Sequence, residues 1–351
     1  MIRQKLGRCG FALVILVVAL VAAAPLGAAE RNHYTVTPLV SDQPGVAPVV
    51  DPDLVNAWGL TASATSPWWV ANNETSTSTL YTGAGQKVPL TVTVGTDSGP
   101  TGVVFNGGLG FVVTNGTTSA PARFIFDSED GLIRGWSPAV DPTNAVVAPA
   151  SADPDASYKG LAIAEGMLYA ADFHNGIVNV FDESWNLVNQ FTDSGLPSGY
   201  APFGIQAIGG RIFVTFAKQD ADAEDEVAGQ GRGFVDVFDT AGNMIARVAQ
   251  HGQLNAPWGL ALAPPEFGRF GGDLLVGNFG DGRINAYEPL SNGHFAYRGR
   301  LRDGSGHAIT IDGLWALAFG NGANAGPTDN LLFTAGPDDE THGLFGKITA
   351  P

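Results

Sequence analysis

The sequence has little of two things, cysteine and positive charge. Its 351 residues include one cysteine, Cys9, so no disulfide can form within the chain. Lysine and arginine together number 18 against 34 aspartate and glutamate residues, and the formal net charge is −16. An acidic surface of this kind repels nucleic acid and anionic lipid and attracts cations. We therefore expect no nucleic-acid partner and no stable membrane insertion.

The common signatures of catalysis are also missing from the sequence. No glycine-rich phosphate loop follows a strand and opens a helix, and no Gly-x-Ser-x-Gly turn occurs. A Ser/His/Asp triad cannot be assigned either. The sequence alone thus names no catalytic residue, and whether the protein is an enzyme stays open.

Long apolar runs are scarce, and the one that stands out lies near the start. Arg3, Lys5 and Arg8 precede the run Phe11–Ala24, and small residues follow at positions 27–29. This order predicts a secretory signal peptide over residues 1–29, because a membrane-spanning helix needs about 20 apolar residues. The alternative is a retained anchor helix. We expect a secreted or periplasmic protein of net charge 15 − 34 = −19, with one domain over residues 30–351.

What the sequence does have is a recurring β-type unit. Within Tyr158–Asp182, alternating apolar residues predict three strands, Gly160–Ala164, Met167–Ala171 and Ile177–Phe181. The unit begins with any residue, then Gly, then an apolar residue, and this start occurs six times, with Ala for Gly in the last copy. The six are Trp58-Gly59-Leu60, Thr101-Gly102-Val103, Lys159-Gly160-Leu161, Phe203-Gly204-Ile205, Trp258-Gly259-Leu260 and Trp315-Ala316-Leu317. Such spacing suits one four-stranded sheet per repeat.

The last repeat lacks a fourth strand, and His33–Val40 is a strand without a repeat of its own. Pairing Tyr34–Leu39 with Leu344–Thr349 would close a ring and remove its exposed edges. We therefore predict an all-β fold, a six-bladed β-propeller closed by the N-terminal strand. A β-sandwich would not show six such repeats, and a solenoid would not need a terminal strand to complete its last unit.

In a propeller, the residues that begin the innermost strands surround one mouth of the central channel. Here these residues are mostly aromatic. Such a ring favours a platform that binds a small molecule, glycan or peptide. The other interpretation is that large side chains plug the channel or wedge between blades. The candidate ligand-binding residues are Trp58, Lys159, Phe203, Trp258 and Trp315.

Two further sets of side chains are expected at the same mouth. Oxygen-bearing residues close the second strand of four repeats: Asn72, Asp127, Asp172 and Asn278. Their oxygens would suit Ca²⁺, or they could simply cap the turns that follow. Four histidines map to loops on this face: His174, His251, His307 and His342. Together with Asp172 they would suit Zn²⁺, although loops also hold ordinary exposed histidines.

An acidic stretch in the fourth repeat, residues 220–226, resembles half of a calcium-binding loop without its central Gly. We expect this stretch to form a solvated flap that could gate the channel mouth.

Several phrases of the sequence resemble a known family. The phrases NAWGL (56–60), FIFDSEDGLIRGW (124–136), YKGLA (158–162), AKQDADAEDEVAG (217–229) and GFVDVFD (233–239) resemble exported bacterial propellers with NHL-type, TolB-like repeats. The likeness spans essentially the whole expected mature chain. Some members of that uncharacterised family carry a C-terminal sorting tail, which this sequence does not show. More distant six-bladed relatives include calcium-dependent lactonases and a zinc-dependent peptide-amidating lyase, none of whose residue motifs occur here.

Two functions remain in view from sequence alone. The first is an exported, monomeric binding module that uses the channel mouth for a small molecule, glycan or peptide. The second is a metal-dependent lyase or hydrolase such as a lactonase, with Ca²⁺ or Zn²⁺ polarising a carbonyl or activating water.

Overall fold

The computed structural model of the chain describes Met1 and residues 32–149 and 155–351. Apart from Met1, the expected signal peptide over residues 1–29 lies outside the described residues. Strands β1 to β27 and one short 3₁₀ helix, η1 (Gly268–Phe270), make up the regular structure of the described part. No helix of that part combines the length and the apolar composition of a membrane span.

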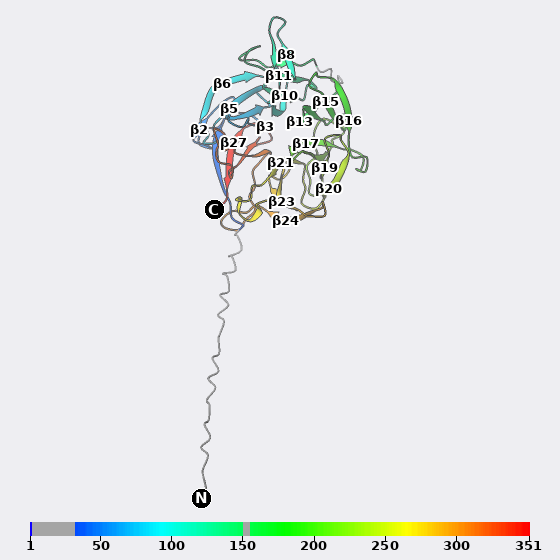
Figure 1. Ribbon diagram of the computed structural model, residues 1–351. Helices are drawn as coiled ribbons and strands as arrows, with labels where there is room; N and C mark the ends of the chain where they lie inside the picture. Colours follow the sequence, from blue (N-terminus) through cyan, green and yellow to red (C-terminus); the bar gives the residue numbers. More distant parts are fainter. Residues whose placement is uncertain (2–31, 150–154) are drawn as a thin grey trace. The chain divides into compact units, whose positions relative to one another are not determined.

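Six sheets surround a common centre, which confirms the predicted six-bladed β-propeller (Figure 1). The first strand of each sheet contacts the first strands of both neighbouring sheets, so these six strands form the innermost ring. Four of the blades consist of four sequential antiparallel strands. Blade 1 holds β3 (Ala57–Thr61), β4 (Trp68–Asn72), β5 (Thr77–Tyr81) and β6 (Lys87–Thr93); blade 3 holds β13 (Tyr158–Ala164), β14 (Met167–Asp172), β15 (Ile177–Phe181) and β16 (Leu187–Phe191); blade 4 holds β17 (Tyr200–Ile208), β18 (Arg211–Lys218), β19 (Phe234–Phe238) and β20 (Met244–Gln250); blade 5 holds β21 (Pro257–Leu262), β22 (Leu274–Asn278), β23 (Ile284–Pro289) and β24 (Phe295–Arg300). The three strands predicted within Tyr158–Asp182 are β13 to β15, with ends that agree within two residues.

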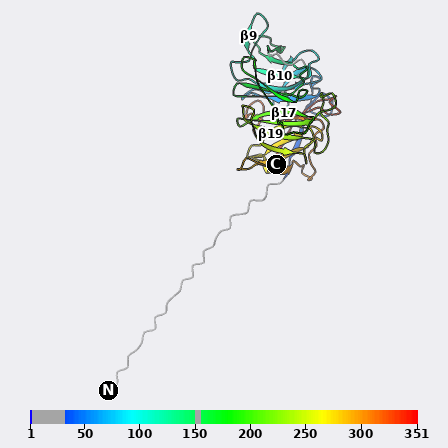
Figure 2. The ribbon, with the colours of Figure 1, turned by 90° about the vertical axis from the view of Figure 1, so that its right-hand side faces the viewer.

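Blade 2 carries an insertion that the repeat pattern did not predict. Its sheet contains β7 (Pro100–Phe105), β10 (Phe124–Ser128), β11 (Ile133–Trp136) and β12 (Val146–Val147). A small hairpin, β8 (Val112–Thr114) and β9 (Ser119–Pro121), lies between its first two strands and forms a separate sheet. Both views show this hairpin projecting beyond the blades (Figures 1 and 2).

The N-terminal strand closes the ring as predicted. Blade 6 holds β25 (Leu314–Phe319), β26 (Leu331–Ala335), β27 (Leu344–Thr349) and β1 (Thr35–Ser41). β1 runs antiparallel to β27, with Thr35 opposite Thr349 and Ser41 opposite Leu344. A two-residue strand, β2 (Val49–Val50), then pairs with β1 in parallel and covers part of the outer edge. That last pairing was not predicted.

The repeated glycine has a steric cause at the centre of the wheel. A Cβ at Gly59 would lie 2.4 Å from the Thr101 carbonyl oxygen, and one at Gly204 would lie 2.2 Å from the Trp258 oxygen. Real Cβ contacts are never this short, so the inner strands of neighbouring blades can approach only where a side chain is missing. The Gly of each repeat therefore permits the contact that builds the ring.

The hydrophobic core consists of layers between neighbouring sheets. One layer joins blades 4 and 5 through Val235, Val237, Leu260 and Val276, all buried. Equivalent clusters fill the other junctions. Because each sheet buries both faces in this way, functional side chains are left to the loops at the two mouths of the channel.

Candidate functional site

The connections between second and third strands meet at one mouth of the channel and hold an acidic hollow. This hollow, here called the acidic mouth, has a volume of about 520 Å³. Five carboxylates and only two basic or imidazole side chains line it. The lining residues are Glu129, Asp130, Asp155, Ala156, Ser157, Lys159, His174, Glu224 and Asp225. The charge of the lining is therefore strongly negative, in keeping with the whole chain.

Lys159 lies at the centre of the acidic mouth, in β13, and only 2% of its side chain is exposed. Its Nζ forms an ion pair with Glu129 of the β10–β11 connection and a second, at 3.3 Å, with Asp225 of the β18–β19 connection. Nζ also lies 5.5 Å from the Trp58 ring centroid, which adds a cation–π contact. Burial alone lowers the pKa of Lys159, but Glu129 and Asp225 raise it more, so the net pKa is above the ordinary value. Lys159 is thus protonated, and the two ion pairs hold its ammonium group in place.

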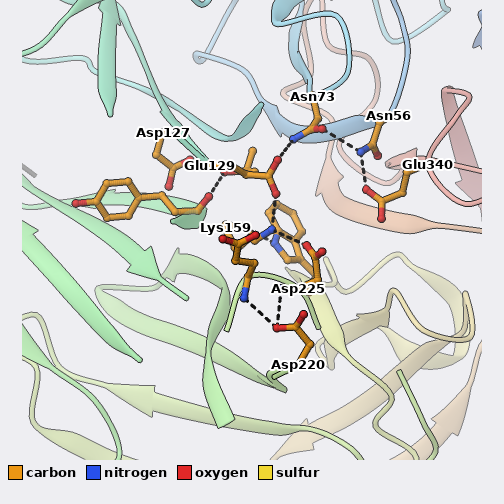
Figure 3. A network of polar contacts seen from close by, with 12 residues as sticks. Asn56, Asn73, Asp127, Glu129, Lys159, Asp220, Asp225 and Glu340 are labelled. Carbon is orange, nitrogen blue, oxygen red and sulfur yellow. Dashed lines mark hydrogen bonds and ion pairs between the residues drawn. The ribbon is translucent and has the colours of Figure 1, made fainter. Parts of the chain in front are cut away.

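A chain of hydrogen bonds extends from Glu129 across blade 1 to blade 6 (Figure 3). Asn73 Nδ2 donates to Glu129 Oε2 at 2.8 Å, and Asn56 Nδ2 donates to Asn73 Oδ1 at 3.3 Å. Asn56 Nδ2 also donates to Glu340 Oε2 at 2.6 Å. Asn56 has φ 46, a left-handed conformation that asparagine tolerates well. Together with the ion pairs of Lys159, the network links residues of five blades.

Two further acids of this face carry raised pKa values. Burial raises the pKa of Glu226 to about 8, although the charge of Lys159 opposes the shift. Burial also raises the pKa of Glu340, whose hydrogen bond from Asn56 acts in the opposite direction. Glu226 therefore gains its proton near pH 8, so the negative charge of the mouth depends on pH.

The aromatic residues of the predicted platform pack together beneath this mouth. Trp58, Phe203 and Trp315 are buried, and the Trp58 and Trp315 rings stack with centroids 3.6 Å apart. Phe279 stacks on the other side of Trp315 at 4.0 Å. We call the following set the aromatic plug: Trp58, Phe173, Phe203, Trp258, Phe279 and Trp315. Its packing matches the second interpretation of the ring, large side chains that fill the channel.

Trp258 differs from the other predicted platform residues because its side chain is only half-buried. Its indole Nε1 donates to the Lys159 carbonyl oxygen at 2.7 Å. Of the five candidate ligand-binding residues, Lys159 lines the acidic mouth, and Trp258 is the aromatic one that keeps exposed surface.

The Asn and Asp residues of the predicted ring have hydrogen-bond partners of their own. Asn72 donates to Thr77 and Thr79 at 3.0 Å, while Asp172 accepts from Asn175 and Asn179 of its own blade. Asn278 donates to the Gln253 carbonyl oxygen and to Asp281. Asp172 also accepts the Asn175 backbone N–H, which is turn capping, whereas Asn72 Oδ1 and Asn278 Oδ1 are buried without a hydrogen-bond partner among the described residues.

Asp127 takes a different place from the one predicted. In blade 1, Asn72 pairs with Ala57, and in blade 2 the corresponding pair is Ser128 with Pro100. Ser128 is therefore the counterpart of Asn72, and the expected alignment was shifted by one residue in blade 2. Asp127 instead accepts hydrogen bonds from the Gly102 backbone N–H at 2.6 Å and from Thr101 Oγ1 at 3.0 Å. Burial raises its pKa to about 7. The side chain belongs to the wall between blades 2 and 3 and not to the mouth.

The four histidines of the predicted metal site have different surroundings and different partners. His174 lines the acidic mouth, whereas His342 Nδ1 is 2.7 Å from Asp42 Oδ2 at the blade 6 rim. His251 contacts the Phe234 ring and the Gly231 carbonyl oxygen, and the His307 side chain is 81% exposed. Within residues 32–149 and 155–351, no group of three or more His, Cys, Asp or Glu side chains is arranged to hold a metal ion.

Sequence reasoning missed the residues that hold Lys159. Glu129 and Asp225 are 30 and 66 positions away from it, and only the ring closure brings them together. A signal was present, because both residues follow the second strand of a repeat, where acidic side chains cluster in the phrases SEDG and DADAEDE. The predicted flap contains Asp225, and the structure ties it to Lys159.

Comparisons with known proteins give relatives of the whole propeller. No protein-family profile matches the chain. An uncharacterised protein of Acanthamoeba polyphaga mimivirus is 35% identical over 323 residues, which cover 88% of this chain and 78% of that protein. A second uncharacterised protein of the same virus is 34% identical over 331 residues, covering 90% and 85%. These relatives are viral, and they do not support the bacterial source implied by the earlier resemblance.

Solved structures with the same architecture are distant in sequence. Virginiamycin B lyase from Staphylococcus aureus matches with a TM-score of 0.52 and 12% identity, covering 90% of this chain and 99% of the lyase. The soluble aldose sugar dehydrogenase from Escherichia coli matches with a TM-score of 0.54 and 12% identity, covering 91% and 100%. At this identity the likeness establishes the six-bladed fold and nothing about activity.

Proposed function

We propose a binding function for this chain, which belongs to the same family of six-bladed propellers as the two mimivirus proteins. The ligand is a small molecule or peptide segment that carries a positively charged amine, and it is held in the acidic mouth. Of the ligand classes expected from the sequence, a neutral glycan suits this lining less well than a cation.

One observation carries the proposal: the protein already holds an ammonium group there. Lys159 Nζ is paired with Glu129 and Asp225 and lies over the Trp58 ring, while further carboxylates line the adjoining hollow. Glu224 is exposed and lines that hollow, whereas Asp130 also lines it but is paired with Arg134. A ligand amine entering it meets carboxylates of the same kind, which can accept its hydrogen bonds.

Binding can be tested by isothermal titration calorimetry at low salt with trilysine and spermidine as cations and maltotriose as the neutral comparison. We expect the cations to bind and the affinity to fall as salt rises, because exposed charges are screened. The double variant Asp225→Asn, Glu224→Gln should weaken trilysine binding by about tenfold, at roughly 0.5–1 kcal/mol per exposed carboxylate.

The matched control is Asp329→Asn, which removes one charge from an exposed position in the β25–β26 connection. It should leave the affinity unchanged. Equal affinities in wild type and the double variant, or tight binding of maltotriose with none of trilysine, would contradict the proposal.

The alternative function, a metal-dependent lyase or hydrolase, finds less support in the described residues. In residues 32–149 and 155–351, no three His, Cys, Asp or Glu side chains are grouped so that they could hold a metal ion. Elemental analysis of protein purified without chelator decides between the two. Stoichiometric Ca²⁺ or Zn²⁺ would favour the enzyme, and metal-free folded protein that takes up neither ion would favour the binding module.

Export and a monomeric state are also proposals, which rest on sequence alone. The basic residues before the apolar run Phe11–Ala24 support export, and the high net charge supports a monomer. The mass of the secreted protein should correspond to cleavage near Ala29, and light scattering should give the mass of one chain. A cell-retained product that keeps residues 1–29 would contradict export.

A further inference from the structure

The other mouth of the channel has the opposite chemistry. The ends of the innermost strands of blades 1, 4, 5 and 6 surround a hollow of about 260 Å³, here called the apolar mouth. Its lining is largely aliphatic and aromatic, and includes Leu60, Trp68, Leu260, Leu317 and Phe319. Leu262, at the rim, is 47% exposed. Concave apolar surface of this kind is the usual setting of small-molecule sites.

The two mouths share no lining residue. A cavity of about 20 Å³ adjoins the apolar mouth, with which it shares Leu60 and Gln206, and it is also lined by Gly59 and Gly102. That volume holds no more than one water molecule. No residue of the aromatic plug lines the apolar mouth, so a molecule there contacts the inner strands together with Trp68 of β4 and Asn321 of the β25–β26 connection. The apolar mouth is thus a separate candidate site, independent of the function proposed above.

Three polar side chains, Thr61, Gln206 and Asn321, interrupt the apolar lining, and the Asn321 amide already donates to the Ser63 and Ser66 carbonyl oxygens. Gln206, in β17, is exposed, and it lines both the apolar mouth and the narrow cavity. Among the described residues no side-chain hydrogen bond of Gln206 is present. The other five inner strands carry small or apolar residues at the position in register with it. These are Thr61, Val104, Ala162, Ala261 and Ala318. Blade 4 therefore places a long amide where the wheel otherwise keeps a short side chain.

The geometry points to a binding site at the apolar mouth for a neutral, mainly apolar small molecule that has one hydrogen-bonding group facing the Gln206 amide. A volume of about 260 Å³ accommodates a compact aromatic molecule of one to three rings. No described Lys, Arg, Asp or Glu side chain lines the hollow, so a charged ligand would lose its hydration without gaining a partner. The primary amide can both donate and accept, which suits an amide, carbonyl or hydroxyl group.

The test uses the fluorescent neutral probe N-phenyl-1-naphthylamine and its displacement by benzamide and by ethylbenzene, which are similar in size and differ in polarity. Wild type should bind the probe saturably with one site per chain. Leu262→Asp should weaken all three ligands at least tenfold. Gln206→Leu should raise the Kd of benzamide about threefold to tenfold, the value of one hydrogen bond, and leave that of ethylbenzene unchanged.

The acidic-mouth variant Asp225→Asn serves as the matched control and should bind all three ligands as wild type does. If Leu262→Asp unfolds, Leu262→Asn is measured in its place. The uncharged variant should fold, because position 262 is already half exposed. The inference is overturned if wild type shows no saturable binding, if the Leu262 variants bind normally, or if Gln206→Leu affects benzamide and ethylbenzene equally.

Discussion

Asp127 offers the sharpest test of how the inner wall is built. Its Oδ1 accepts the Gly102 N–H, while Oδ2 is buried without a partner among the described residues. In blades 4 and 6, Thr215 and Thr334 occupy the equivalent position and accept the corresponding inner-strand N–H groups at 2.8 and 3.0 Å. The variant Asp127→Thr should therefore keep the hydrogen bond and remove the buried acid.

The magnitude follows from the pKa of this carboxyl group. Burial raises the pKa of Asp127 from 3.8 to about 7. Between those values the folded chain holds a proton that the unfolded chain has lost, so this residue's contribution to the free energy of unfolding falls as pH rises and is constant above about pH 7. Each unit corresponds to about 1.4 kcal/mol, so the loss between pH 5 and pH 8 is about 2 to 3 kcal/mol.

Urea unfolding of wild type and Asp127→Thr at pH 5 and pH 8 measures this loss as a difference, in which the other titrating groups cancel. The variant should gain stability relative to wild type by about 2 to 3 kcal/mol between the two pH values. Asp127→Asn, a neutral variant of the same shape, should show the same pH dependence. If the gap between variant and wild type is the same at both pH values, Asp127 is ionised in the folded protein and the reasoning is refuted.

Three further predictions concern stability and assembly. Glu129→Gln leaves the ammonium of buried Lys159 poorly paired and should lower the free energy of unfolding in urea by about 3 kcal/mol. Lys159→Met should lower it less, because the Glu129 carboxylate that it leaves unpaired is 32% exposed to water. Equal losses for the two variants would contradict this prediction. Removing residues 32–41 deletes β1 and exposes the edge of β27, so the protein should aggregate in gel filtration, and a stable monomer would show that closure is dispensable. Gly343→Ala places a Cβ 1.9 Å from the Leu54 carbonyl oxygen and should lower the melting temperature far more than the control Gly107→Ala, whose Cβ would meet only the Phe105 ring at 3.4 Å.

The fold was predictable because its cause is local and repeated. A Gly that permits close approach recurs at each inner strand, and the unpaired strand at the start matches the missing strand at the end. The hairpin β8–β9 and the short strand β2 were not predictable, since neither belongs to the repeat. The shift at Asp127 arose because Asp127 and Ser128 are both polar, and only the pairing with Pro100 shows which one ends the strand in register.

The candidate site was predictable in place but less so in detail. Sequence reasoning put Trp58, Phe203 and Trp315 at one mouth, yet it could not tell an open platform from a filled channel, because both use the same residue types. The pairing of Lys159 with Glu129 and Asp225 depends on loops from three blades. Gln206 was not singled out, since one glutamine in a strand has meaning only when the register shows that the other blades carry small or apolar side chains there.

The pairing of β1 with β27 also sets an order of events for the growing polypeptide. The first strand of the propeller is synthesised roughly 300 residues before its partner, so it has to wait, with its backbone groups bonded to water, until the ribosome has made almost the entire chain. No truncated product that stops before Leu344 can complete the wheel. A chaperone that binds nascent strands would therefore stay bound longest to residues 35–41.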